Sequence, residues 1–265
     1  SYNFSNQFVP WTSWSNSGWP DHYLAVYDSY IKVYDFYKNY GLTSVDGFGT
    51  PLLILTDYCD STKKPVDNAV YLGMCAGWAV FSASAANDFG ECIDVAAHEF
   101  THGITDYSTG GNLYQNQYGA VNEGISDVCG NLCEMLLGET TDQTWLLGEN
   151  SGKAVRCMSD PWMYGQPSVM YDKYYYPETE EPGMDNDYGG VHINSSLIGY
   201  VAYRFCEEGM PADQAFGLWM GVLRLMTPKS GYREIHEALK FAADIRKMDD
   251  GWQTRIDEIC GDAGY

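Results

Sequence analysis

The chain has 265 residues, enough for one large domain or two small lobes around a buried core. Hydrophobic residues make up 45% and charged residues 19%, which excludes a disordered chain, and no apolar run reaches the roughly 20 residues of a membrane-spanning helix. The formal net charge of −21 argues against nucleic-acid binding, because such a surface repels phosphate. We therefore expect neither nucleic acid nor a membrane among its partners.

Residues 1–20, with tryptophans among Ser, Asn, Gly and Pro, predict an irregular aromatic arm. Apolar residues at helical spacing then predict a helix from Asp21 to Tyr40 that ends at Gly41. Short apolar segments separated by glycine or polar residues predict three strands, at residues 50–59, 68–73 and 77–84.

Beyond Gly90 the pattern changes from strands to helices. Helical periodicity occupies residues 91–108 and 119–138, and residues 161–190 predict a long loop rich in Tyr, Pro and Gly. Three further helices are predicted at residues 193–209, 211–226 and 230–245, and a final amphipathic segment follows them.

Strands early and helices late indicate an α+β fold rather than alternating βαβ units. We expect a β-rich N-terminal lobe in residues 1–117 and a mainly α-helical C-terminal lobe in residues 118–265. The sequence shows no flexible interdomain linker, so the lobes should share a broad contact, with any cleft at their junction.

Eight cysteines are spread along the chain without a CxxC pair, which favours an oxidising compartment. Ser1 is not followed by a basic run and an apolar stretch, so we expect a secreted, extracellular mature chain. Cys129 and Cys133 lie on one predicted helix, where a disulfide between them would strain it. We predict disulfides between distant cysteines, without assigning partners; eight buried thiols in a reducing compartment are the alternative.

The pentapeptide HEFTH at residues 98–102 is the most informative motif. On a helix, His98 and His102 lie one turn apart on nearly the same face, so both imidazoles can bind one metal ion. Glu99 lies beside His98, close enough to reach a water on that metal, but it is not placed as a third ligand.

A catalytic zinc site needs a third protein ligand and keeps an open fourth position. Glu123, on the next predicted helix, can supply that ligand if the two helices pack side by side. Asp127, one turn later, is spaced to accept the free N–H of a ligating imidazole. Taken alone, Glu123 would more often be a solvated helix charge.

Four segments occur in order: HEFTHGITDY, YQNQYGAVNEGISD, RCMSDP and GGVHINSS. In these segments the chain resembles the thermolysin-like zinc metalloendopeptidases, and the resemblance extends from about Asp21 to the C-terminus. The resemblance implies a central zinc-binding helix in the cleft between the lobes, one catalytic Zn²⁺ and protein or peptide substrates cleaved at internal bonds by a zinc-activated water. We expect a monomer.

By matching positions, the resemblance implies His98, His102 and Glu123 as zinc ligands and Glu99 as the general base. The resemblance also implies that Asn122 and Asp127 surround these ligands without binding the metal themselves.

The resemblance further implies that His192 and Tyr114 stabilise the oxyanion, with Asp187 as the carboxylate partner of His192. Arg156 matches an arginine that holds the substrate carbonyl. Packing roles are the alternatives for His192 and Tyr114, and a structural ion pair is the alternative for Arg156.

Asn68 and Ala69 match the edge that pairs with the substrate backbone. Three apolar residues are expected to line the pocket for a hydrophobic side chain just after the scissile bond: Val95, Leu147 and Val155.

The family's paired-calcium site is matched at three carboxylates only: Asp94, Glu134 and Glu149. Thr144 and Leu146 stand where further acidic ligands would be expected. Since Ca²⁺ prefers six to eight oxygens, we predict at most one calcium ion.

Three other functions are weaker. A structural zinc site would need four protein ligands, and no suitable Cys or His lies near. A metzincin would need a third histidine where Ser108 stands. The aromatic-rich loop could stack sugar rings in a glycan-binding module with a relic metal site, but the intact Glu99 argues against a relic.

Overall fold

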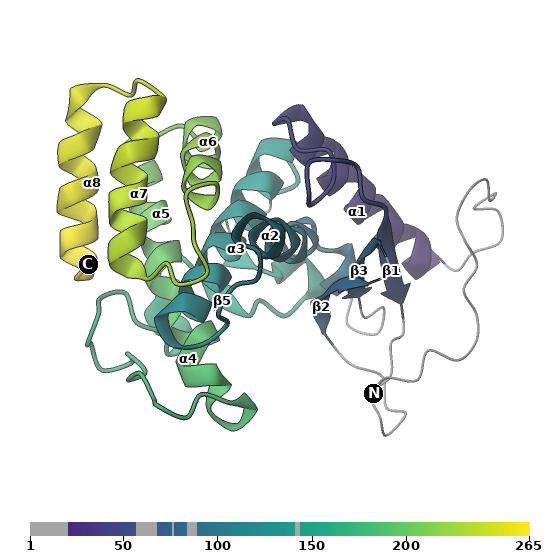
Figure 1. The fold of residues 1–265 in the computed structure, drawn as a ribbon, viewed down its shortest axis with the longest axis horizontal. Helices are drawn as coiled ribbons and strands as arrows, with labels where there is room; N and C mark the ends of the chain where they lie inside the picture. Colours follow the sequence, from purple (N-terminus) through teal and green to yellow (C-terminus); the bar gives the residue numbers. More distant parts are fainter. Residues whose placement is uncertain (1–20, 57–67, 76, 84–88, 141–143) are drawn as a thin grey trace.

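The structure is a computed structural model that describes residues 21–56, 68–75, 77–83, 89–140 and 144–265. The predicted aromatic arm and Cys59 lie outside these residues. The described chain combines a small sheet near the N-terminus with a mainly helical C-terminal part, so the predicted α+β class is confirmed (Figure 1). No helix in the described part is both long and apolar enough to span a bilayer.

The N-terminal part contains helix α1 (Asp21–Asn39) and strands β1 (Leu52–Thr56), β2 (Ala69–Cys75) and β3 (Trp78–Ala83). The strand order is β1-β3-β2, with β3 parallel to β1 and antiparallel to β2. A register shift between Tyr71 and Gly73 bends β2 at the sheet edge. This edge strand forms one wall of the cleft described below.

Helices α2 (Ile93–Thr109) and α3 (Asn116–Leu137) form the centre of the molecule. In Figure 1, α2 is seen nearly end-on between the sheet and α3. Gly130 allows these helices to approach closely, because a Cβ there would lie 2.4 Å from the carbonyl oxygen of Asp94. The close packing brings the polar faces of both helices together.

The remaining elements are the short strands β4 (Leu146–Leu147) and β5 (Arg156–Cys157) and five helices: α4 (Asp187–Asn194), α5 (Ser196–Glu207), α6 (Ala212–Leu223), α7 (Tyr232–Ile245) and α8 (Asp250–Ala263). The sequence predicts one helix over residues 193–209, and this was wrong. In the structure α4 ends at Asn194 and α5 begins at Ser196, with Ser195 between them. The hydroxyl of Ser196 bonds to the carbonyl of Pro167, a distant partner that sequence spacing does not reveal.

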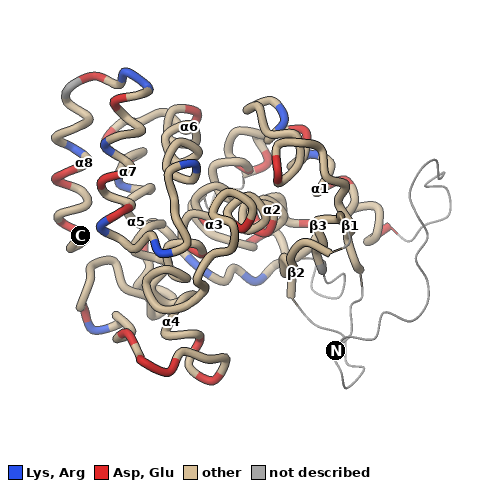
Figure 2. Tube along the Cα trace, in the orientation of Figure 1, with Lys and Arg blue, Asp and Glu red and all other residues tan. Residues whose placement is uncertain are grey.

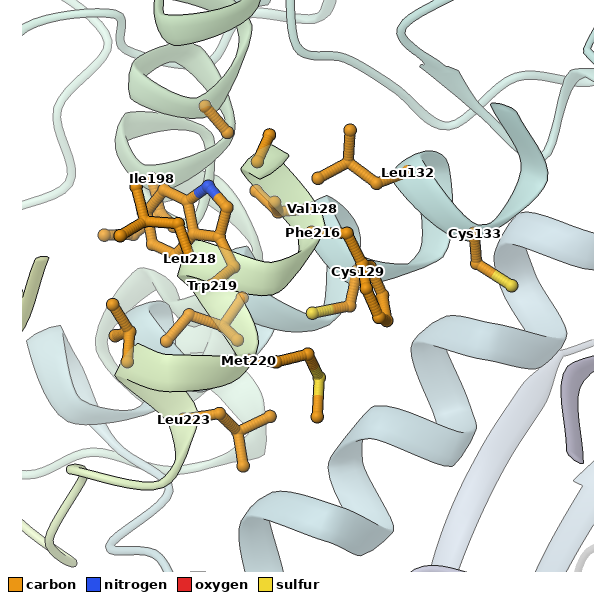
Figure 3. Packing of buried hydrophobic residues seen from close by; sticks show 14 of the residues in the cluster. Val128, Cys129, Leu132, Cys133, Ile198, Phe216, Leu218, Trp219, Met220 and Leu223 are labelled. Atoms are coloured by element: carbon orange, nitrogen blue, oxygen red, sulfur yellow. The ribbon is translucent and has the colours of Figure 1, made fainter. Parts of the chain in front are cut away.

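One buried apolar cluster extends from Val26 on α1 to Ala263 on α8. Figure 3 shows its middle, where Phe216 of α6 lies beside Cys129 of α3, and Trp219 of α6 lies near Ile198 of α5. The predicted division at residue 117 falls at the start of α3 and stays a prediction; the apolar core is continuous across it.

The predicted disulfides are not seen, since no disulfide joins the described cysteines to one another. Cys129 and Cys133 are fully buried on one face of α3, and Cys260 is buried on α8. Such thiols pack as small apolar groups. The spacing of these cysteines in the sequence does not predict this packing.

Candidate active site and metal centre

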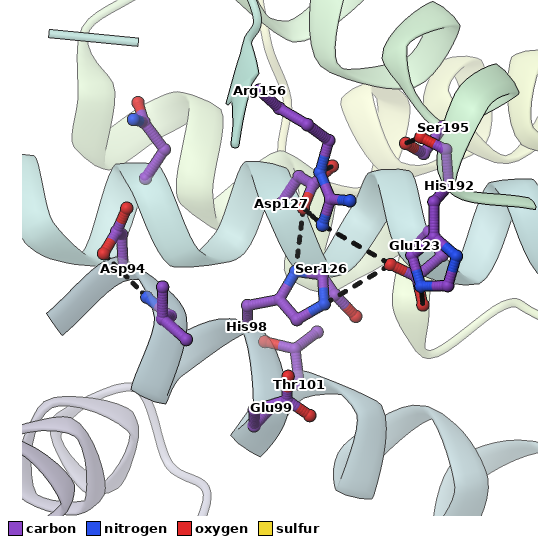
Figure 4. Close-up of polar contacts among 12 residues, drawn as sticks. Asp94, His98, Glu99, Thr101, Glu123, Ser126, Asp127, Arg156, His192 and Ser195 are labelled. Atoms are coloured by element: carbon purple, nitrogen blue, oxygen red, sulfur yellow. Dashed lines mark hydrogen bonds and ion pairs between the residues drawn. The ribbon is translucent and has the colours of Figure 1, made fainter. Parts of the chain in front are cut away.

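Helices α2 and α3 bring His98, His102 and Glu123 to one point. The two Nε2 atoms lie 2.9 Å apart, and the Glu123 carboxylate oxygens lie 3.4 Å from that of His98 and 3.2 Å from that of His102. These donor atoms all lie within 4.8 Å of one another and could hold a metal ion. Figure 4 shows His98 directed toward Glu123 across the two helices.

The outer nitrogens of both imidazoles lie next to side-chain oxygens. His98 Nδ1 lies 2.8 Å from Asp127 Oδ1, and His102 Nδ1 lies 3.0 Å from Asn122 Oδ1. If each Nδ1 donates to its oxygen, both Nε2 lone pairs face the same point, where they repel unless a cation lies between them. Glu123 Oε2 is buried there without a hydrogen bond. This donor set fits a zinc ion.

The acidic surroundings also favour positive charge in this centre. Burial lowers the pKa of His98, but Asp127 and Glu123 raise it more, to about 10. Burial raises the pKa of Glu123, yet the neighbouring His192 and His102 hold it well below its usual range. Glu123 is therefore a carboxylate, ready to ligate a metal.

Glu99 lies on α2 next to the ligands and is 6% exposed. Its Oε2 accepts the backbone N–H of Tyr71 on β2 at 2.5 Å, so the sheet edge orients the carboxylate. Burial raises the pKa of Glu99, while His98 and His102 oppose that shift. A carboxylate with a raised pKa beside a metal site is suited to accept and return a proton.

A second group of side chains faces the ligands from α4 and from the segment before α3. The hydroxyl of Tyr114 donates to Glu123 and lies 3.3 Å from His192 Nε2. Asp187 holds His192 twice, through Nδ1 at 2.5 Å and through the backbone N–H at 2.9 Å. Partial burial lowers the pKa of His192, but Glu123 and Asp187 produce a net increase.

A strained turn makes the pairing of Asp187 with His192 possible. Residues 187–190 all have positive φ, including the non-glycine residues Asp187 at 53° and Tyr188 at 50°. Gly190 also lies against Tyr176, where a Cβ would come within 2.5 Å of the Tyr176 side chain. Such strain is commonly retained at functional sites.

Arg156 lies on the other side of the centre, in β5. Its Nε and one Nη lie 2.9 Å from the two oxygens of Asp127, and the same Nη lies 3.6 Å from Glu123 (Figure 4). Asp127 therefore joins the His98 imidazole to the guanidinium. In this geometry Arg156 is an ion-pair partner whose other face is turned to the cleft.

The ligands open into a cleft of about 860 Å³. The predicted substrate-binding residues all line it: Asn68, Ala69, Val95, Leu147, Val155 and Arg156. Asp127 and Asp187 do not line the cleft. They contact lining residues instead, Asp127 next to His98 and Asp187 next to His192.

Residues that sequence reasoning did not single out also line the cleft, among them Tyr71, Asp106, Lys153 and Tyr188. Asp106 accepts the Tyr71 hydroxyl at 3.1 Å. Its position one helical turn after His102 could have revealed it. Nothing in the sequence pattern marks Lys153.

Two family models match the chain: the thermolysin metallopeptidase catalytic domain over residues 10–106 and the alpha-helical domain over residues 111–255. The chain belongs to the thermolysin metallopeptidase family. A bacillolysin from Bacillus caldolyticus is 34% identical over 256 residues, covering 89% of this chain and 44% of the relative. Neutral protease NprE from Bacillus pumilus is 31% identical, covering 84% of this chain and 73% of the relative.

The chain thus spans less than half the length of several curated relatives. Among solved structures, the precursor of protealysin from Serratia proteamaculans is similar, with a TM-score of 0.74 and 26% identity over 94% of this chain and 80% of that one. Membership of the thermolysin metallopeptidase family implies a catalytic zinc, which agrees with the donor set of His98, His102 and Glu123.

Away from the zinc centre, Asp94, Glu134 and Glu149 form a second group of carboxylates within 4.8 Å of one another. Burial raises the pKa of Asp94 to about 6 and that of Glu134 to about 8. Asn150 donates to one oxygen of Glu134 at 2.9 Å, while the other oxygen is buried without a hydrogen bond. Closely spaced buried carboxylates of this kind suit a hard cation such as Ca²⁺.

Proposed function

We propose that the protein is a secreted zinc-dependent endopeptidase that hydrolyses internal bonds of proteins and peptides. The observation that carries this proposal is the convergence of His98, His102 and Glu123 beside Glu99 in an open cleft. In the described part of the chain these three donor groups form one cluster, and a catalytic zinc site of this kind keeps its fourth position for a water or substrate. Secretion is part of the proposal and rests on the sequence alone.

Zinc, when bound, acts as a Lewis acid and makes a water molecule acidic enough to react near neutral pH. Glu99 takes the proton of the attacking water and delivers it to the leaving amine. His192, held by Asp187, and Tyr114 provide donors for the negative charge on the former carbonyl oxygen. Tyr114 would exchange its bond to Glu123 for one to the substrate.

The edge strand β2 suits an extended substrate. Asn68 and Ala69 lie at its start and line the cleft, so a peptide can add to the sheet edge there. On the opposite wall, Val95 and Leu147 are buried and Val155 is partly exposed. This apolar wall supports a preference for a hydrophobic residue just after the scissile bond.

We expect a peptide with Leu just after the scissile bond to be cleaved at least about tenfold faster, in kcat/KM, than one with Ala, because each buried methylene contributes about 0.8 kcal/mol. Val155→Ser should reduce that ratio. Val169→Ser is the matched control, since both valines are 38% exposed and Val169 does not line the cleft. Equal ratios in all three proteins would contradict the assigned pocket.

A glycan-binding function has less support. In the loop before α4, the ammonium of Lys173 lies 4.3 Å from the ring centre of Trp162 and 4.5 Å from that of Tyr174. These rings are therefore engaged within the loop. Casein digestion with and without 1,10-phenanthroline separates the two functions: zinc-dependent cleavage supports the endopeptidase, and glycan binding without cleavage supports the module.

For Asp94, Glu134 and Glu149 we propose one calcium ion at most. Calcium added after EDTA treatment should raise the Tm in a single step, and Glu134→Gln should remove that response because it deletes a buried ligand charge. Glu139→Gln, at an exposed residue paired with Lys32, should keep it. Stepwise stabilisation by two or more ions, measured by calorimetry, would show the single-ion proposal to be wrong.

A further inference from the structure

Lys153 lines the cleft next to the apolar wall formed by Leu147 and Val155. Its side chain is exposed, and no ion-pair partner for its ammonium occurs among the described residues. The position is suited to a negative group supplied by a ligand.

The backbone that follows Lys153 connects the apolar wall to β5. Val155 donates its N–H to Leu147 at 2.9 Å, and the chain then enters β5, where Arg156 turns toward Asp127. Lys153 precedes Val155 by two residues, and both line the cleft. Because both residues line the same cleft, a peptide with a side chain against Val155 has its following residues in the part of the molecule where the long Lys153 side chain also lies.

Other charges of the cleft do not compete for a carboxylate. Arg156 is already paired with Asp127 and lies near Glu123. Asp106 lines the cleft as an acid, and further acids stand in the loop before α4, visible as a red stretch in Figure 2. Among the described lining residues, Lys153 is therefore the cation available to a substrate.

We propose that Lys153 is a specificity-determining residue that recognises a carboxylate two positions after the scissile bond, either an Asp or Glu side chain or the terminal carboxylate of the peptide. The proposal rests on the proposed endopeptidase function. Its effect is modest and salt-sensitive, because the ammonium is exposed to solvent.

The test uses fluorogenic peptides with Leu just after the scissile bond, followed by Glu, Gln or Lys, each amidated at the C-terminus. A shorter pair ends at that second position with a free or an amidated terminus. For the natural protein we expect about two- to fivefold higher kcat/KM with the carboxylate than with its neutral counterpart. The first set reports a side-chain carboxylate and the second a terminal one.

Lys153→Met should abolish the preference, and Lys153→Glu should reverse it in favour of Lys. Lys229→Glu, the same charge change at an exposed lysine outside the cleft, should leave the preference intact. Unchanged ratios in both Lys153 variants, with the Gln peptide still cleaved, would overturn the proposal while the endopeptidase function stands. Failure of the zinc-loaded natural protein to cleave any peptide would instead overturn the function, and the Lys153 proposal with it.

Discussion

Glu99→Gln is expected to lower kcat by at least about 10²-fold while zinc remains bound. The reason is that Gln has nearly the same shape but cannot accept the proton of the attacking water, and general base catalysis typically contributes about 10²–10⁴-fold. Glu99 is not among the convergent ligand groups, so its replacement leaves the donor set intact. The measurements are kcat on a fluorogenic peptide and zinc content by atomic absorption.

The control for this variant is Glu139→Gln, an exposed change of the same chemistry with an expected kcat near that of the natural protein. Circular dichroism checks that both variants are folded. Retention of more than about a tenth of the natural kcat by a zinc-loaded Glu99→Gln protein would remove Glu99 from the role of general base.

Glu123→Gln is expected to weaken zinc binding by at least about 100-fold, because it removes the charged ligand of the three. Asp127→Asn should cost less, about 10–100-fold, since Asp127 acts through the His98 imidazole. Zinc affinity measured by competition with a chromophoric chelator ranks the variants. The Tm increase on adding zinc should follow the same order, because ligand binding stabilises by mass action.

The order of these two effects is the informative result. If Asp127→Asn weakened zinc binding more than Glu123→Gln did, Glu123 would not be the carboxylate ligand of the metal. If neither changed the affinity, the metal would lie elsewhere. Far-UV circular dichroism of the metal-free variants separates loss of zinc from loss of folding.

The central part of the site could be predicted because it follows from helical geometry. His98 and His102 are one turn apart on α2, and Glu123 and Asp127 are one turn apart on α3. The packing of the two helices depends on Gly130, whose missing side chain allows the close approach.

Other features depend on contacts between distant segments. The bond from the Tyr71 N–H to Glu99 requires the edge strand to lie over α2, which no local pattern encodes. The left-handed conformation of Tyr188 is uncommon for a residue other than glycine, whereas Asp187 is of a type that adopts it more readily; both are maintained by the surrounding structure. Ser195 interrupts a helical pattern that reads as continuous in the sequence.

The cysteines show the limit of composition as a guide. Their number favoured disulfides, yet Cys129, Cys133 and Cys260 are buried thiols in the apolar core. A thiol is small and apolar enough to pack there, so the same count is compatible with both outcomes.

The most direct test of the account is a crystal structure of the zinc-loaded protein, with the metal identified by anomalous scattering at the zinc edge. We predict one ion bound by His98 Nε2, His102 Nε2 and a Glu123 oxygen, with Glu99 outside the coordination shell and a water in the remaining position. A fourth side chain on the ion, or three ligands that point away from it, would contradict a hydrolytic centre.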